Sequence, residues 1–562
     1  MGRIVRPDAE PPVTGRRLIR QANDRGPSLS EHVSHGLHKV SWRAPLDGLR
    51  LGGRPPLKLL AVPKDPVAGD KAAGDAILSG RLDDLDPGAS LPPVVRDYLQ
   101  GFAWLRDLAA AATRDRGAPI AERQVRGWIA RFGTDVDPVA WRPDLWGRRI
   151  LFWTAYAPYI LSGGDAALRA DVLGMLTRGT RYLRRSADKA MPGLPRVTAW
   201  AGLVASALLL QGGPARLPRG EAGLARALGE ALHEDGGLLS RSPEDQLALV
   251  DLLAQLRAVY LSVQADMPGA LEDALDRAPT ALLAATLGDG ALCHWQGGGV
   301  ASARRVLAAI EGTGIAHKPL RLAHGWGYQR LEARGTVLVV DAAPPPPLRA
   351  ARYGCASTLA FEMSDGSHRL IVNCGGGRHA PEALEAPLRT SAAHSTLVLA
   401  DCNSTAVQED GTLGKGVVEV ELVRDAEAGA QKLEASHDGY VRRSGLLHRR
   451  LLELSADGLA LSGEDRLEPR GKHRAGWRQA FAVRFHLAPG VEVTSTADGK
   501  GALLRIRGGH VWQFRCRGGS LLGEDSLWID ADGRAQQTQQ LVISGETGPD
   551  GAAVTWSLRR AG

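Results

Sequence analysis

The stretch GYQRLEARGTVLVVDAAPPPP (residues 327–347) separates two parts of the chain that have different hydrophobic periods. Within it, residues 337–341 alternate with the two-residue period of a β-strand. The prolines at 344–347 lack backbone N–H donors, so we expect them to bridge two strands at a sheet edge. Because helical spacing gives way to strand spacing around this stretch, we predict a domain boundary between about residues 312 and 330.

Before this boundary, from about residue 95 onward, apolar residues recur at helical spacing. Leu249, Leu252, Leu256 and Tyr260 form one such stripe. Glycine-containing breaks separate this stripe from the others. Serial helices of this kind predict stacked antiparallel pairs, arranged either as a solenoid or as a closed α/α toroid. The sequence has no fixed-period repeat, which argues against the standard solenoid families.

After the boundary, short runs with a period of two follow one another, for example at 359–363, 418–422 and 554–558. Asp-Gly turn signals stand between many of them. Many strands without intervening helices predict a sandwich of antiparallel sheets. The expected order is therefore an extended basic arm at 1–60, a helical domain at 61–320 and an antiparallel β-sandwich at 325–562.

Composition limits the possible classes of function. The chain has 562 residues, too many for one core, and a net charge of +7. This charge fits a polyanionic partner such as acidic polysaccharide, nucleic acid or lipid headgroups, and it equally fits an arginine-rich proteome. No apolar run is long enough to span a bilayer. Nucleic acid is the weaker choice, because the aromatic content is only 5% and no recognised module is present.

The chain offers little that predicts a metal or disulfide framework. Its five cysteines are odd in number and contain no CxxC pair. His32, His35 and His38 have helical spacing, but without an accompanying cysteine a metal site there is the less favoured interpretation. The N-terminal residues lack the apolar segment of a cleavable signal.

The sequence contains no HExxH, Walker loop, GxSxG elbow or strand-linked GxGxxG. These absences argue against the common metalloprotease, NTPase, α/β-hydrolase and Rossmann classes. Among the remaining polar clusters, His394 follows the small residues 391–393 and precedes the apolar run 397–399. Such a histidine is either a structural residue or a proton-transfer group aimed at a neighbouring domain. Tyr440 is likewise either a phenolic proton donor or an amphipathic strand residue.

Five segments resemble the heparinase II/III-type polysaccharide lyases, in the same order along the chain. The strongest match is RTSAAHSTLVLAD (389–401), which is similar to the "R…AAHNTL" strand of that family. The other four segments are DPVAGDKAAGDAILSGRL (65–82), HEDGGLLSRSPEDQL (233–247), the opening stretch at 327–347, and HDGYVRRSGLLHRRLLEL (437–454). The resemblance extends over roughly residues 65 to 560 and implies that the helical domain at 61–320 is an incomplete α/α toroid.

The resemblance implies cleavage of a glycosidic bond next to a uronic acid by β-elimination. A polar residue binds the uronate carboxylate, a Tyr or His removes the C5 proton, and a Tyr or His protonates the leaving oxygen. His394 matches the catalytic histidine of the family. The candidate residues are His394, Tyr260 and Tyr440 for proton transfer, and Arg196, Arg241 and Arg389 for substrate binding.

This chain departs from the family pattern in the helical half. No Asn lies between Asn23 and Asn373, so the usual carboxylate-binding residue is missing, and Arg196 is the expected substitute. Tyr260 is a displaced substitute for a Tyr that usually follows the Ser-Pro pair. Thr396 stands where some members have a second metal-binding His, so a structural zinc is doubtful and no cofactor is expected.

Two functions remain open. The first is a lyase that acts on acidic polysaccharide of the cell envelope or exopolysaccharide. The second is a non-catalytic glycan-binding or scaffold protein that retains the lyase fold. The resemblance implies the cell envelope or periplasm, and the lack of a visible signal leaves the cytoplasm as the alternative. In either case we expect the main pocket between the two domains, bordered by Arg196, Arg241 and His394.

Overall fold

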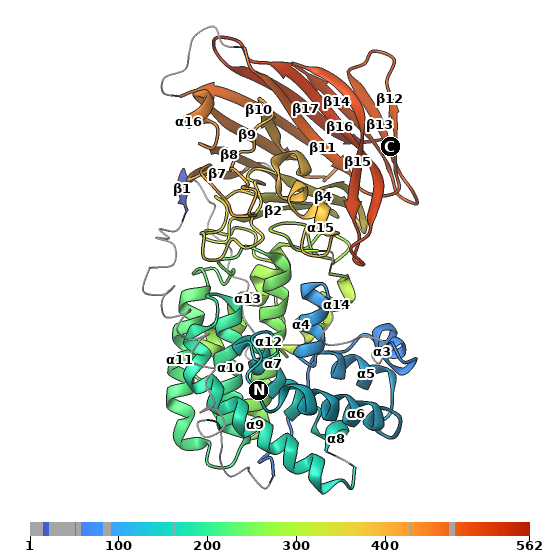
Figure 1. Ribbon diagram of the computed structural model, residues 1–562. Coiled ribbons are helices and arrows are strands. Elements are labelled where there is room, and N and C mark those ends of the chain that lie inside the picture. The colour runs from blue at the N-terminus through green and yellow to red at the C-terminus, as the bar shows by residue number, and fades with distance from the viewer. Residues whose placement is uncertain are drawn as a thin grey trace.

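The computed structural model describes residues 15–21, 51, 58–81, 91–161, 163–299, 301–427, 429–470 and 478–561. Most of the arm predicted at 1–60 lies outside these residues, as do His32, His35 and His38. Figure 1 shows a helical half followed by a β half, which confirms the predicted fold class.

The helical half contains mostly antiparallel neighbours joined by short connections. Its α-helices are α3 (Lys71–Leu78), α4 (Pro93–Gln100), α5 (Trp104–Ala111), α6 (Arg114–Phe132), α7 (Pro143–Ala155), α8 (Ala157–Ile160), α9 (Ala166–Ser186), α10 (Leu194–Leu209), α11 (Leu217–Ala231), α12 (Pro243–Ser262), α13 (Gly269–Ala284) and α14 (Ala303–Gly312). Several begin at a side chain that accepts hydrogen bonds from the first turn, as Asp165 does for α9 and Ser242 for α12.

Helix α10 is the centre of the helical half, because it packs against α7, α9, α11 and α12. The approach to α7 is close: a Cβ atom added to Gly202 would lie 2.4 Å from the Cα of Gly147. Both positions therefore need glycine. The apolar stripes that predicted the helices, including Leu249, Leu252 and Leu256, are buried in this core.

The β half consists of two antiparallel sheets packed face to face. The nine-stranded sheet has the order β1-β7-β8-β9-β10-β17-β14-β13-β12, and the eight-stranded sheet contains β15-β16-β11-β5-β4-β3-β2 with β6 paired to β11. The strands of the first sheet are β1 (Arg17–Arg20), β7 (Glu419–Glu427), β8 (Ala430–His437), β9 (Leu446–Leu454), β10 (Ala460–Pro469), β12 (Val491–Ser495), β13 (Gly501–Ile506), β14 (Val511–Arg517) and β17 (Ala552–Arg560). Those of the second are β2 (Tyr328–Ala333), β3 (Thr336–Asp341), β4 (Phe361–Asp365), β5 (His368–Val372), β6 (Leu397–Leu399), β11 (Ala480–Leu487), β15 (Ser520–Ile529) and β16 (Ala535–Glu546).

Residues 15–21 of the predicted arm include β1, which pairs with β7 at the edge of the nine-stranded sheet. Only Ile19 of this strand is packed against the apolar core. The segment is held mainly by backbone hydrogen bonds and by ion pairs of Arg16 and Arg20 with glutamates of β7. The N-terminal segment thus covers the edge of a sheet in which all other strands lie after residue 418.

An apolar cluster joins the two halves. The ring of Trp295 stacks on Tyr328 with centroids 4.9 Å apart, and Trp326 meets Tyr328 edge to face at the same distance. Residues from α13 and β3 belong to the same cluster. Because buried aromatic rings stabilise such contacts strongly, the two halves form a fixed junction beside which a cleft can be built.

Candidate functional site

A cleft of about 460 Å³ lies where the helical half meets the loops of the β half. This is the interdomain position at which we expected a pocket. The polar residues that line it include Arg96, Arg142, Arg148, Ser240, Ser242 and Glu244 from the helical half, and Gln296, Arg349, Arg352, Tyr353 and Arg378 from the segments that face it.

Most guanidinium groups at the helical wall are paired with carboxylates. Arg142 donates to Asp97 at 2.8 Å and also to Asp144. Arg106 binds Asp251 at 2.6 Å, and this pair is buried in the floor of the cleft. Burial lowers the pKa of the Arg106 guanidinium, but the neighbouring carboxylates outweigh burial and raise it. These arginines are fixed and their charges are largely neutralised.

Two arginines of the cleft differ from the others. Arg148, from α7, and Arg352, from the loop after the proline run, line the cleft and have no carboxylate partner within the part of the chain that the structure describes. Tyr353 lies between cations, since the guanidinium of Arg352 is 5.2 Å and that of Arg378 4.6 Å from its ring centroid. Arg148 and Arg352 can therefore bind an anionic ligand without first breaking an ion pair.

One end of the cleft is closed by a clamp between the two halves. Glu244, in the first turn of α12, accepts from Nε2 of His379 at 2.9 Å, and Arg378 donates to Asp245 at 2.8 Å. Burial alone would raise the pKa of Glu244, but Arg378 and His379 lower it to about 2. The clamp is charged at neutral pH and ties the helical wall to the loop at 375–379.

His394 does not line the cleft, although we expected it to border the pocket. It follows a short 3-10 turn at Ser391–Ala393, and its Nδ1 donates to the carbonyl of Thr390 at 2.7 Å. Because a carbonyl can only accept, the Nδ1 atom carries the proton and Nε2 holds a free lone pair. Burial lowers the pKa of His394, so the ring is neutral at physiological pH.

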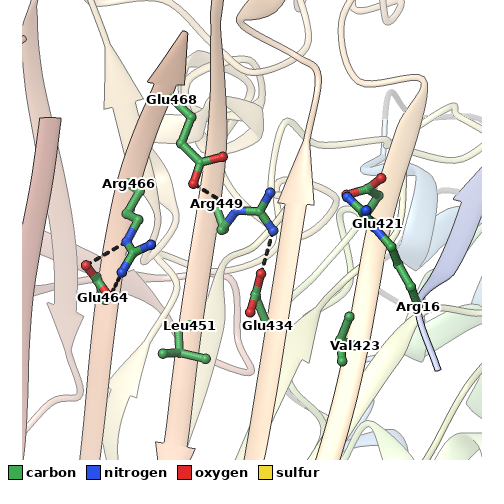
Figure 2. A pocket seen from close by; sticks show the side chains of 9 residues that line it. All are labelled: Arg16, Glu421, Val423, Glu434, Arg449, Leu451, Glu464, Arg466 and Glu468. Atoms are coloured by element: carbon green, nitrogen blue, oxygen red, sulfur yellow. Dashed lines mark hydrogen bonds and ion pairs between the residues drawn. The ribbon is translucent and has the colours of Figure 1, made fainter. Parts of the chain in front are cut away.

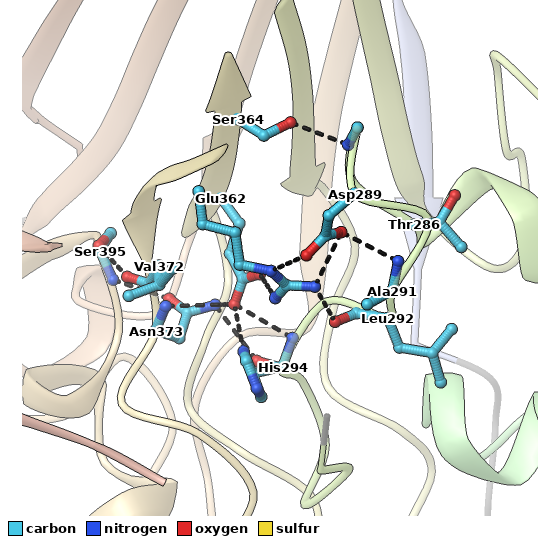
Figure 3. A network of polar contacts seen from close by, with 12 residues as sticks. Thr286, Asp289, Ala291, Leu292, His294, Glu362, Ser364, Val372, Asn373 and Ser395 are labelled. Atoms are coloured by element: carbon cyan, nitrogen blue, oxygen red, sulfur yellow. Dashed lines mark hydrogen bonds and ion pairs between the residues drawn. The ribbon is translucent and has the colours of Figure 1, made fainter. Parts of the chain in front are cut away.

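A polar network beside His394 holds its strand to the junction (Figure 3). The carboxylate of Glu362 accepts from the backbone N–H of His294 and from Nδ2 of Asn373, each at 3.1 Å, and Asn373 in turn accepts from the N–H of Ser395. Burial alone would raise the pKa of Glu362, but His294 and Arg369 hold it below its usual value. The network holds the segments around His294, Asn373 and Ser395 in fixed positions relative to one another.

The two predicted tyrosines lie away from the cleft. Tyr260 donates to Glu221 at 2.7 Å, and Tyr440 donates to the carbonyl of Leu397 at 2.8 Å. Burial raises the pKa of both phenols, which disfavours ionisation. Tyr260 cannot replace a tyrosine near Ser242 because 18 helical residues, about 27 Å, separate them along α12.

Arg241 and Arg389 are structural in this arrangement, although we expected both to bind substrate. The guanidinium of Arg241 donates to Asp341 at 2.5 Å and to the carbonyls of Trp326 and Pro344, each at 2.8 Å. Arg389 donates through Nε to the carbonyl of Gly354 at 2.8 Å. With His394, Tyr260 and Tyr440, these side chains are 2% exposed or less.

Arg196 lies close to the cleft in sequence but is turned away from it. Its neighbours Leu194, Pro195 and Thr198 line the cleft, while its own guanidinium binds Glu230 at 3.0 Å and the carbonyl of Ala190. Arg196, Arg241 and His394, which we expected to border the interdomain pocket, are not among the residues that line the cleft. Its position in the helical turn places Arg196 on another face of α10. The guanidinium of Arg241 is hydrogen-bonded through Nε and both Nη atoms to residues of the junction.

Sequence inspection missed the residues that do line the cleft. Arg349, Arg352 and Tyr353 follow the proline run, and Arg378 follows the glycines at 375–377. A basic or aromatic residue directly after a loop-forming segment was the available signal. Those glycines matter for placement, since a Cβ on Gly376 would lie 2.2 Å from the carbonyl oxygen of Gly298.

Among the described residues, no group of three or more His, Cys, Asp or Glu side chains is placed to hold a metal ion. The free thiols there include Cys374, whose pKa burial raises to about 11. Within the same residues, no helix has both the length and the apolar character needed to cross a bilayer.

A helical half followed by a two-sheet β half, with a cleft between them, is the architecture of polysaccharide lyases that act on acidic glycans. Residues 316–557 match the family model described as heparinase II/III-like, C-terminal. The chain is 31% identical over 533 residues to FtsZ-localized protein C of Caulobacter vibrioides, covering 90% of this chain and 91% of that protein. The chain belongs to the heparinase II/III-like family.

Solved structures show the same fold at low sequence identity. A crystal structure of heparinase III is similar with a TM-score of 0.69 and 13% identity, covering 97% of this chain and 93% of that one. A chondroitin AC lyase of Streptomyces coelicolor A3, solved in complex with chondroitin sulphate, has a TM-score of 0.54 and 14% identity over 94% of this chain and 83% of its own. At these identities the likeness concerns the fold alone.

Proposed function

We propose that this chain is a non-catalytic member of the family that binds acidic, uronate-containing polysaccharide in the interdomain cleft. One observation carries the proposal: Arg148 and Arg352 line the cleft and have no carboxylate partner among the described residues, whereas none of the predicted proton-transfer side chains lines it. Guanidinium groups bind carboxylates in a bidentate manner, which suits the uronate carboxylates of such a glycan. Binding without elimination follows from this set of groups.

The test combines binding with a search for product. Purified protein is titrated calorimetrically with short oligosaccharides of chondroitin sulphate and of polygalacturonate, and the same mixtures are followed for ultraviolet absorbance of unsaturated uronate. We expect saturable binding that weakens with salt and no absorbance increase. Absence of binding to every acidic glycan tested would overturn the proposal, and so would steady formation of unsaturated product.

A β-eliminating lyase is the second candidate, and the protonation state of His394 favours it. With Nδ1–H bound to Thr390, the Nε2 lone pair has the correct form for a base. In that reaction Nε2 takes the C5 proton, the C4–O bond breaks as a C4–C5 double bond forms, and the resulting imidazolium gives the proton to the leaving oxygen. The reaction requires the loops above His394 to open, and appearance of unsaturated product would select this function.

We also propose that the chain acts at the cell envelope where FtsZ is found. The support is the identity of 31% to a Caulobacter protein that is named for its localisation to FtsZ. A fluorescent fusion of the full chain should co-localise with FtsZ in cells. A uniform distribution that ignores FtsZ would contradict this localisation and would leave the glycan proposal to be judged by its own titration.

A further inference from the structure

The outward face of the nine-stranded sheet is divided into two halves that differ in charge pairing. On the β7–β10 half, a hollow of about 500 Å³ contains Arg16, Arg449 and Arg466, and each of these arginines is bound to a glutamate (Figure 2). Arg449 binds two, Glu434 at 2.5 Å and Glu468 at 3.0 Å. We call this the paired half. Its guanidinium charges are satisfied within the sheet.

The other half of the face is formed by β12, β13, β14 and β17, and most of its arginines are not in ion pairs with other described residues. Alternate residues of these strands are buried, which directs Arg505, Arg515, Arg517 and Arg559 to the outward face, where all four are exposed. We call this the basic half. Arg515 is bound to Asp498, whereas the other three have no carboxylate partner among the residues that the structure describes.

Strand register brings these arginines together. Gln513 of β14 lies opposite Arg559 of β17 on one side and Leu503 of β13 on the other. Arg515 is two residues further along β14, so its Cα lies about 8 Å from that of Arg559. Arg505 is two residues beyond Leu503 in the opposite direction. The guanidinium groups therefore flank a central amide on a flat surface.

The basic half has a net positive charge that is only partly compensated, because Asp498 binds Arg515 and Glu492 of β12 lies opposite Arg505 of β13. Glu492 is the single acidic side chain among the outward residues of β12, β13, β14 and β17. Like charges held together at a surface repel one another and disfavour the folded state unless an anionic partner is present. Hydroxyl and amide groups lie between the charges, at Thr494, Gln513, Thr555 and Ser557.

These outward side chains favour one kind of polyanion. The aromatic residues of these strands, Trp512, Phe514 and Trp556, are buried on the inner face, so the outward face has no platform on which nucleic acid bases could stack. Leu503 is the one large apolar side chain exposed there, which is too little for insertion into a lipid surface. Guanidinium and hydroxyl partners together suit an acidic polysaccharide.

We propose that the basic half is a second binding surface for acidic polysaccharide, separate from the interdomain cleft. The choice of ligand class rests on the proposed function. A long chain of the same glycan is then held at two places on one molecule. Its apparent affinity exceeds that of a short oligosaccharide, because the second contact forms at high effective concentration.

The experiment compares two matched double variants on immobilised chondroitin sulphate and in solution with its tetrasaccharide. Arg505→Gln/Arg559→Gln removes two charges that have no ion pair among the described residues, and Arg449→Gln/Arg466→Gln removes two paired charges from the same face. We expect the first variant to bind the polymer about tenfold more weakly and to elute at lower salt, with tetrasaccharide affinity unchanged. The second variant should bind the polymer like the unaltered protein.

Each of the following outcomes would overturn the inference. Equal weakening by both double variants would show an effect of net charge alone, and no weakening by the first would show that the surface is not used. Tighter retention of duplex DNA, abolished by Arg505→Gln/Arg559→Gln, would assign the surface to nucleic acid. If the tetrasaccharide binds while the polymer gains nothing, this inference fails and the cleft proposal stands; if neither ligand binds, both fail.

Discussion

The cleft and the junction beside it use arginine in opposite ways. Arg241, at the junction, spends its Nε and both Nη atoms on Asp341 and on backbone carbonyls, and it is closed off from solvent. Arg148 and Arg352, in the cleft, face open space without a carboxylate partner in the described parts of the chain. An arginine in a segment that resembles the family can therefore have a structural role. The arginines that are free to bind a ligand lie outside those segments.

Among the variants that test this difference, removal of Arg241 should have the largest effect. Arg241→Ala leaves Asp341 as a buried carboxylate without its partner, and we expect the free energy of unfolding to fall by about 3–5 kcal/mol. Urea unfolding of the purified variant measures this loss. Arg148→Ala serves as the control and should change stability by less than about 1 kcal/mol. A similar small loss for both variants would contradict the structural role of Arg241.

His394 tests whether the buried region contributes to stability or to chemistry. His394→Ala removes a buried ring and one of the two hydrogen bonds to the carbonyl of Thr390, so unfolding should become easier by about 2 kcal/mol. Oligosaccharide affinity should remain as it was. Thermal unfolding and calorimetric titration of the same preparation measure the two effects. An unchanged melting temperature together with about a hundredfold loss of unsaturated product would instead establish the lyase.

The double variant Arg148→Gln/Arg352→Gln tests whether the two cleft arginines bind the ligand. Neither change removes an ion pair among the residues that the structure describes, so we expect oligosaccharide affinity to fall about tenfold, about 1.4 kcal/mol, with no shift in melting temperature. Arg466→Gln, on the outer sheet face, is the matched control and should bind the oligosaccharide normally. Unaltered affinity in the double variant would remove the cleft as the binding site.

The smallest effect concerns the clamp at the end of the cleft. The pKa of Glu244 is about 2 in the folded chain, below its usual value of about 4.5, so the clamp contributes stability that is complete above about pH 4.5 and is lost as the pH falls toward 2. Glu244→Gln should lower the free energy of unfolding at pH 7 by about 1 kcal/mol. The difference from the unaltered protein should shrink at pH 3.5, as measured by urea unfolding at both pH values. A difference independent of pH would contradict a charged clamp.

Periodicity was sufficient to predict the order of helices and strands, because apolar stripes such as Leu249–Leu256 report directly on which face is buried. The site was not predictable in the same way. Arg196 and Thr198 are two positions apart, yet only Thr198 lines the cleft, since helical phase decides which side chain points there. Arg241 pairs with Asp341, a residue 100 positions away, and no local pattern in the sequence reveals such a partner.

Because β1 covers a sheet edge, loss of the N-terminal segment during purification should make the protein prone to aggregate. The backbone of β1 covers the hydrogen-bonding edge of β7, while only Ile19 is anchored in the core. Proteolytic trimming through residues 15–21 would leave a nine-residue strand edge open to strand addition from another molecule. Preparations that lose this segment should therefore aggregate through sheet edges while both domains are still folded, which makes an intact N-terminal segment a quality criterion for any binding measurement.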